Sequence, residues 1–127
     1  MMFDGYHLFC LELKTIAGKS ISFERTEKDK GDIHYHQIEY LKSCLNFENM
    51  IPGLIIDFRG TGNTWFLHIK EWDELISSIT KKSFNESNLL SYAHPLLISN
   101  KKLKVNYRYD VEEFINNVTK MEAWYDV

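Results

Sequence analysis

The stretch YHLFCLELK, residues 6–14, decides the fold prediction. It follows the turn signal Asp4-Gly5 and has the apolar character of a β-strand, in which alternation places Cys10, Glu12 and Lys14 on one face. Both faces are mostly apolar as far as Glu12, which is typical of a strand covered on both sides. Two charges on a buried face are unfavourable unless they are paired or bind a ligand. Glu12 and Lys14 therefore stand out, unless the strand simply emerges into solvent at Glu12.

The bulk composition is that of an ordinary globular protein. The chain has 127 residues, of which 44% are hydrophobic and 26% are charged, enough for one domain with a modest core. It contains no run of about 18 apolar residues, so we expect no membrane span and no membrane partner. Cys10 and Cys44 lie in apolar patterns without Cys-X-X-Cys spacing, and the start of the chain lacks a signal-peptide pattern. These features predict a cytoplasmic protein with reduced, buried thiols.

A helix is expected over residues 33–45, after a short edge strand or ordered loop at 20–23 and a charged loop at 24–32. Asp32 is the expected N-cap. Ile38, Leu41 and Leu45 recur with helical spacing and predict the buried stripe. Gln37 lies four residues before Leu41 and so borders that stripe, and the alternative is an ordinary capping or surface residue.

The rest of the chain predicts a mixed α/β domain. Residues 54–58 and 64–69 are expected to form a hairpin around the turn at 60–63. Helices are expected at 71–80 and from the capping-box sequence Ser83-Phe84-Asn85-Glu86 to about Tyr92. Weaker strand signals at 96–98 and 103–107 precede a final helix that begins near Asp110.

One basic run could contact nucleic acid. The net charge of −3 argues mildly against such a partner, because Lys and Arg drive phosphate binding. Residues 101–108, however, hold four positive charges and no negative one: Lys101, Lys102, Lys104 and Arg108. These four are the candidate nucleic-acid-binding residues, and the alternative is a solvated surface.

The order of these segments resembles the RecU group of Holliday-junction resolvases, within the PD-(D/E)XK nuclease superfamily. The segment CLELKT (10–15), then SISF (20–23), then HQI (36–38) with Leu41, is similar to the active-site region of that group. GLII (53–56) followed by WFL (65–67) is similar to its central hairpin, and Lys82-Ser83 and the segment RYD (108–110) have counterparts as well. The resemblance implies a restriction-endonuclease-like fold, a mixed central sheet flanked by helices, over residues 1–127.

The resemblance also implies an activity and its residues. It implies a Mg²⁺- or Mn²⁺-dependent, structure-selective DNA endonuclease of DNA recombination and repair, acting as a homodimer on branched or double-stranded DNA. Glu12 would bind the metal through its carboxylate and Leu13 through its backbone carbonyl. Lys14 would lie beside the attacking water or a phosphate oxygen, and Gln37 would face the catalytic strand.

The chain departs from the family pattern at its start. These nucleases carry an acidic residue, normally Asp, on the strand before Glu-X-Lys, and the matching position falls ahead of Met1, as do the family's N-terminal helix and stalk. Asp4 lies eight residues before Glu12 and is the candidate metal ligand, although Asp4-Gly5 fits better as the turn that joins the two strands, where a metal ligand would be misplaced. The expectation is therefore an N-terminally truncated nuclease or a protein that has lost catalysis. The alternatives are an inactive DNA-binding or assembly module on this fold, and an interaction domain in which Glu12 and Lys14 form a structural ion pair.

Overall fold

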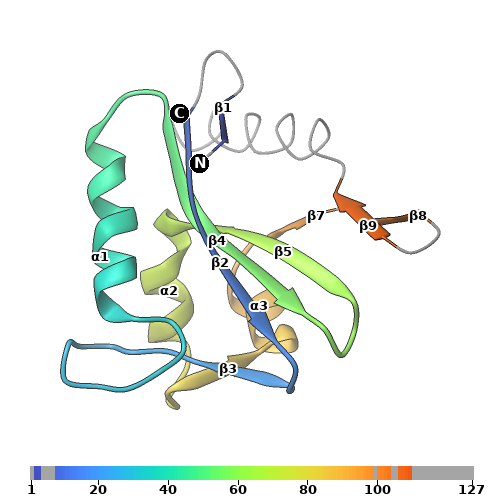
Figure 1. Cartoon of the computed structure of the whole chain (residues 1–127). Coiled ribbons are helices and arrows are strands. Elements are labelled where there is room, and N and C mark those ends of the chain that lie inside the picture. Colours follow the sequence, from blue (N-terminus) through green and yellow to red (C-terminus); the bar gives the residue numbers. More distant parts are fainter. Residues whose placement is uncertain (1, 4–7, 99, 104–105, 110–127) are drawn as a thin grey trace.

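A mixed five-stranded sheet forms the centre of the protein (Figure 1). The computed structural model describes residues 2–3, 8–98, 100–103 and 106–109. The strand order is β1-β2-β4-β5-β7, and these strands span Met2–Phe3, Leu8–Ile16, Met50–Phe58, Asn63–His68 and Leu96–Ile98. β2 is parallel to β4, and the other neighbouring pairs are antiparallel. The predicted strand that carries Glu12 is confirmed as β2, and the predicted central hairpin is confirmed as β4 with β5. The α/β class is confirmed as well.

The alternation predicted for β2 is confirmed by the two hydrophobic clusters on either side of the sheet. Cys10 and Ile16 belong to the larger cluster, on the helical side. Phe9 and the half-buried Leu11 belong to the smaller cluster, on the opposite side. β2 is thus covered on both faces in its first half, as its apolar sequence predicts.

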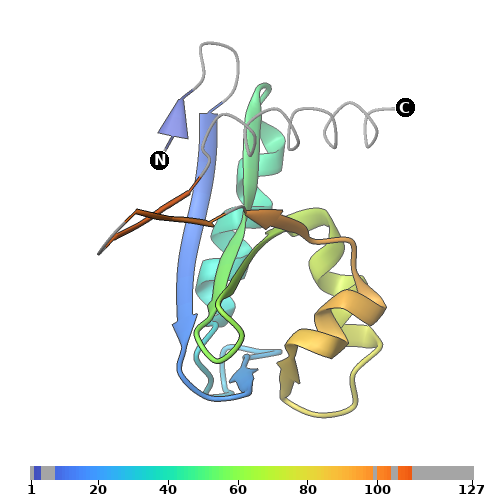
Figure 2. The ribbon, with the colours of Figure 1, turned by 90° about the vertical axis from the view of Figure 1, so that its right-hand side faces the viewer.

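Three helices cover one face of the sheet. They are α1 (Tyr35–Ser43), α2 (Trp72–Ser77) and α3 (Glu86–Tyr92), and their buried residues join the larger cluster. Figures 1 and 2 show α1 and α2 on the same side of the strands. Because β2 and β4 are parallel, the chain between them must cross back over the sheet, and α1 makes that crossing. It thereby lies against the face of β2 that carries Glu12 and Lys14.

The predicted N-cap of α1 is wrong. The helix begins at Tyr35, with His34 as N-cap, because Ile33 forms a parallel bridge with Phe23 and cannot be helical. The carboxylate of Asp32 instead accepts a hydrogen bond from the hydroxyl of Ser22, with 3.0 Å between Oγ of Ser22 and Oδ2 of Asp32. Asp32 therefore holds the loop against the neighbouring strand rather than capping the helix.

Two further helix predictions need correction. Leu45 was expected in the buried stripe but is 38% exposed, because α1 ends at Ser43 and a 3-10 turn (Cys44–Asn46) buries Cys44 instead. Ser83 was expected to start the capping box of α3, but residues Ser83–Asn85 form strand β6. Asn85 is the N-cap, and its side-chain oxygen accepts the backbone N–H of Asn88 at 2.8 Å.

The remaining strands form two small ribbons. β3 (Ser20–Ser22) pairs with β6, which confirms the short strand expected there. The single strand predicted at 103–107 is wrong, because the chain instead forms an antiparallel pair, β8 (Asn100–Leu103) and β9 (Asn106–Tyr109). α2 is preceded by a 3-10 turn (Ile69–Glu71) and ends earlier than expected. The predicted last helix lies outside the described residues.

Among the helices that the structure describes, none has the length and apolar character required to cross a lipid bilayer.

Candidate functional site

Glu12 and Gln37 meet where α1 lies against β2. The side-chain amide of Gln37 donates from Nε2 to Oε1 of Glu12 at 2.8 Å. Its own oxygen accepts the backbone N–H of His34 at 3.1 Å. The second bond fixes which end of the amide faces the strand, so Gln37 must present a donor to Glu12. The predicted position of Gln37 beside the Glu-X-Lys strand is confirmed.

Lys14 lies two residues further along the same face of β2. Glu12 and Lys14 are both half-buried, whereas Leu13 between them is 63% exposed. Both charged side chains are thus partly open to solvent, although Ile16 further along the same face is buried again, so the two charges escape the full desolvation that a buried face would impose. Within the described part of the chain, Glu12 and Lys14 form no ion pair with each other, so the expectation of a structural pair between them is wrong.

The backbone N–H and C=O groups of Leu13 point away from β4, toward the opposite edge of β2. The N–H of Leu8 donates to the carbonyl of Asn49 at 2.7 Å, and the carbonyl of Ile16 accepts from Arg59 at 3.1 Å. Even-numbered residues of β2 thus direct their backbone groups toward β4. Because these groups alternate along a strand, the carbonyl of Leu13 faces the opposite edge.

The predicted metal ligands are Glu12, Leu13 and Asp4. Across residues 8–98, no three His, Cys, Asp or Glu side chains come together in a way that could hold a metal ion. β1 pairs with Leu8 and Phe9, and Glu12 lies about 10 Å further along β2. Asp4, the other predicted ligand, lies outside the described residues. Among the described residues, no cluster of acidic, His or Cys side chains therefore surrounds the predicted ligand Glu12.

A buried carboxylate holds the loop that leads into α1. Glu24 is 9% exposed and accepts the backbone N–H of Tyr35 at 2.9 Å and that of Gly31 at 3.2 Å. Its Oε2 lies 2.8 Å from Nδ1 of His34. The bond to His34, followed by that to the backbone of Tyr35, lowers the pKa of Glu24 below its ordinary value. The sequence does not reveal this contact, because only the folded chain brings Glu24 to the start of the helix.

The two cysteines are free and buried, as predicted. They lie in the larger cluster, Cys10 on β2 and Cys44 after α1. Burial, together with contact with Cys44, raises the pKa of Cys10 to about 11. A thiol in that state is a poor nucleophile and a poor metal ligand at neutral pH.

The basic run lies on the β8–β9 ribbon. In the register of this ribbon Lys101 is the partner of Arg108, and Lys102 is the partner of Tyr107. Lys104 lies outside the described residues. The ribbon is a separate two-stranded sheet, so the run is not part of the sheet that carries Glu12.

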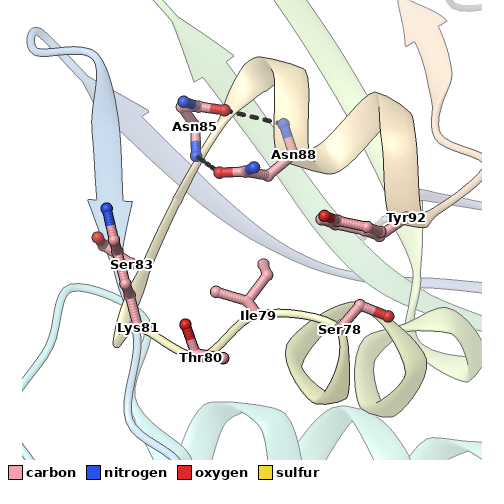
Figure 3. Close-up of a pocket in the computed structure, with 8 residues that line it drawn as sticks. All are labelled: Ser78, Ile79, Thr80, Lys81, Ser83, Asn85, Asn88 and Tyr92. Carbon is pink, nitrogen blue, oxygen red and sulfur yellow. Dashed lines mark hydrogen bonds between the residues drawn. The ribbon is translucent and has the colours of Figure 1, made fainter.

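Two surface pockets lie apart from Glu12, Lys14 and Gln37. One of about 240 Å³ is bounded by the segment after α2 and by α3 (Figure 3), and its lining is Ser78, Ile79, Thr80, Lys81, Ser83, Asn85, Asn88 and Tyr92. The other, of about 360 Å³, is lined by Gly18, Lys19, Phe58, Gly60, Thr61, Asn85, Glu86 and Ser87. Neither lining includes a predicted site residue.

Comparison with known proteins finds a relative but no defined family. No protein-family model matches the chain. The chain is 30% identical over 138 residues to the SPbeta prophage-derived uncharacterized protein YotM of Bacillus subtilis (strain 168). The alignment covers 96% of this chain and 65% of that protein, so the chain spans less than two thirds of the relative's length.

Proposed function

We propose that this chain is a nuclease-type domain that acts on branched or double-stranded DNA, with Glu12, Lys14 and Gln37 in its hydrolytic site. The observation that carries the proposal is the 2.8 Å hydrogen bond from Gln37 to Glu12. It joins the strand that holds the Glu-X-Lys sequence to the helix that crosses over it. The resemblance to RecU-type resolvases implies a polar residue on that helix facing the strand, and Gln37 matches it.

The topology around the site supports a restriction-endonuclease-like arrangement. The Glu-X-Lys strand β2 has an antiparallel neighbour in β1 and a parallel neighbour in β4. β4 then pairs with β5 in the hairpin that the resemblance implies. This order places Glu12 next to a crossover helix in a mixed sheet.

Each residue would have a distinct part in phosphodiester hydrolysis. Gln37 orients the carboxylate of Glu12 through one oxygen and leaves the other oxygen available. Lys14 places a positive charge on the same face, where it would offset charge that develops on a phosphate. A divalent cation, when bound, lowers the pKa of a bound water and screens the phosphate. Glu12 and the Leu13 carbonyl would hold it only together with a further ligand, for which Asp4 is the candidate in this chain.

The test is cleavage of a synthetic four-way DNA junction with Mg²⁺ or Mn²⁺, with a linear duplex for comparison. Glu12→Ala and Lys14→Ala should each lower the cleavage rate by about 100-fold or more, because each removes a group that acts on the reacting phosphate. Glu27→Ala and Lys28→Ala remove the same charges from an exposed loop and serve as controls. Cleavage that survives both site substitutions unchanged would exclude this site.

A second candidate is a catalytically silent DNA-binding or assembly module on the same fold. The incomplete metal-ligand set among the described residues favours it. This candidate predicts DNA binding that weakens steeply with salt, with no metal-dependent cutting. Replacing Lys101 and Lys102 by Ala should then reduce the salt dependence along with the affinity.

A further inference from the structure

The pocket between α3 and the segment that follows α2 has mostly polar walls (Figure 3). Its volume of about 240 Å³ is roughly eight times the share of liquid volume that one water molecule takes. Of the eight described residues that line it, Ile79 is the one aliphatic residue, Lys81 is the one cation, and none is acidic. A polar pocket whose charge is positive suits an anionic ligand.

The two asparagines of the lining bring hydrogen-bond donors to the pocket, because their oxygens are already bound. Oδ1 of Asn85 accepts the backbone N–H of Asn88 at 2.8 Å, and Oδ1 of Asn88 accepts the backbone N–H of Asn85 at 3.1 Å. This reciprocal cap fixes which end of each amide carries the oxygen, so each side-chain NH₂ group remains as a donor. Ser78 differs, because its hydroxyl already donates to the carbonyl of Glu74 at 3.0 Å.

Arg25 binds backbone oxygens of the segment that forms one wall. Its guanidinium donates to the carbonyl of Ile79 and, at 2.9 Å, to the carbonyl of Lys81. Arg25 is not itself a lining residue, so these bonds direct the two oxygens toward a cation outside the pocket. The backbone acceptors that would repel an anion are therefore occupied, and a positive charge is held beside the wall.

Donors reach the pocket from different sides. In Figure 3 the side chain of Thr80 comes from the segment after α2, whereas Asn88 and Tyr92 come from α3, with Ile79 between them. Asn88 and Tyr92 are four positions apart and so share one face of the helix. Three converging donors match the three terminal oxygens of a phosphate monoester. A phosphodiester and a carboxylate each present only two such oxygens.

We propose that this pocket binds the phosphate group of a small phosphate monoester. Thr80, Asn88 and Tyr92 donate to its terminal oxygens. The exposed Lys81 offsets its negative charge. This inference does not rest on the nuclease proposal, because Glu12 is not part of the lining.

The test compares methyl phosphate with dimethyl phosphate, a matched monoester and diester, in amide proton–nitrogen NMR spectra of the native protein. Methyl phosphate should shift the side-chain NH₂ resonances of Asn88 and the backbone resonances of Thr80 and Lys81 in a saturable way. Dimethyl phosphate should bind at least about tenfold more weakly, because it has lost one acceptor oxygen and one negative charge. Potassium chloride at equal ionic strength should produce no saturable shift.

Asn88→Asp separates the donor from the stability of the fold. The new carboxylate can still accept the backbone N–H of Asn85, so the unfolding midpoint should stay close to that of wild type. The NH₂ donor is lost, however, and the Kd for methyl phosphate should rise at least about tenfold. Asn46→Asp makes the same change at an exposed position and should leave the Kd unchanged. Lys81→Ala should raise the Kd about threefold or more, whereas Lys28→Ala, on an exposed loop, should not.

Wild-type resonances that follow ionic strength alone would overturn the proposal, and so would equal Kd values for wild type and Asn88→Asp. Displacement of methyl phosphate by a DNA duplex without terminal phosphates would overturn the assignment to a monoester. The nuclease proposal fails separately: Asn88→Asp should leave junction cleavage unchanged, and Glu12→Ala should leave methyl phosphate binding unchanged.

Discussion

Gly53→Ala should destabilise the protein strongly, because β4 has no room for a side chain at this position. A Cβ on Gly53 would lie 2.5 Å from Cε1 and 2.7 Å from Cζ of Phe66, and 2.6 Å from the carbonyl oxygen of Leu67. Phe66 is fully buried, and β4 pairs with strands on both sides. Neither the ring nor the backbone can therefore move away cheaply.

The expected loss follows from the size of this clash. Overpacking by one methyl group in a rigid core costs roughly 1–3 kcal/mol, and the closeness of three contacts places Gly53→Ala toward the upper end. Alanine regains about 0.5–1 kcal/mol because glycine is unfavourable within a strand, so the net loss should be about 2 kcal/mol. For a chain of this length that corresponds to a fall in Tm of roughly 8 °C.

The measurement is thermal and urea unfolding of Gly53→Ala beside Gly18→Ala. A Cβ at Gly18 meets nothing within 4 Å, so that control should be neutral or slightly stabilised. In a Phe66→Leu background, Gly53→Ala should cost less stability than it does in wild type, because the ring atoms of Phe66 are gone. Part of the cost should remain, because the carbonyl oxygen of Leu67 is still in place. Equal stability of Gly53→Ala and Gly18→Ala would refute the close approach of β4 to β5 described above.

Two further predictions concern titratable groups. The lowered pKa of Glu24 means that its contribution to stability is fully present above its ordinary value of 4.5 and is lost as pH falls through the lower folded value. Unfolding midpoints measured between pH 7 and 3 should therefore fall more steeply below about pH 4.5 for wild type than for Glu24→Gln; parallel curves would contradict this. Because burial raises the pKa of Cys10 to about 11, native protein at pH 8 should react with a thiol reagent far more slowly than protein in denaturant, and rapid native labelling of Cys10 or Cys44 would count against it.

The sequence predicted the parts of the site that depend on local periodicity. Alternation along β2 correctly placed Glu12 on the face of Cys10, and helical spacing correctly placed Gln37 on the side of α1 that borders Ile38 and Leu41. That Gln37 would face the strand of Glu12 was implied only by the resemblance to RecU-type resolvases, and the hydrogen bond between the two side chains confirms it. Each pattern repeats within a few residues, so a single sequence is enough to show it.

The parts that were missed depend on contacts between distant segments. Asp32 has the sequence character of an N-cap, but a bridge from Ile33 to Phe23 delays the start of the helix. Ser83 likewise has cap character, but pairing of β6 with β3 moves the cap to Asn85. In both places a tertiary backbone hydrogen bond competes with the local signal and prevails. Nothing near Glu24 in the sequence indicates that its carboxylate will bind the backbone of Tyr35.

The parallel pairing of β2 with β4 has a consequence for the order of folding. The β4–β5 hairpin closes between Phe58 and Asn63, whereas β2 joins the sheet by pairs such as Glu12 with Leu54, which lie 42 positions apart in the sequence. Closing the longer loop loses more chain entropy, so the hairpin should form early and β2 should dock late. In pulse-labelled hydrogen exchange during refolding, amides of β5 should gain protection before those of β2. The strand that carries Glu12 would then be the last large piece of the sheet to become ordered.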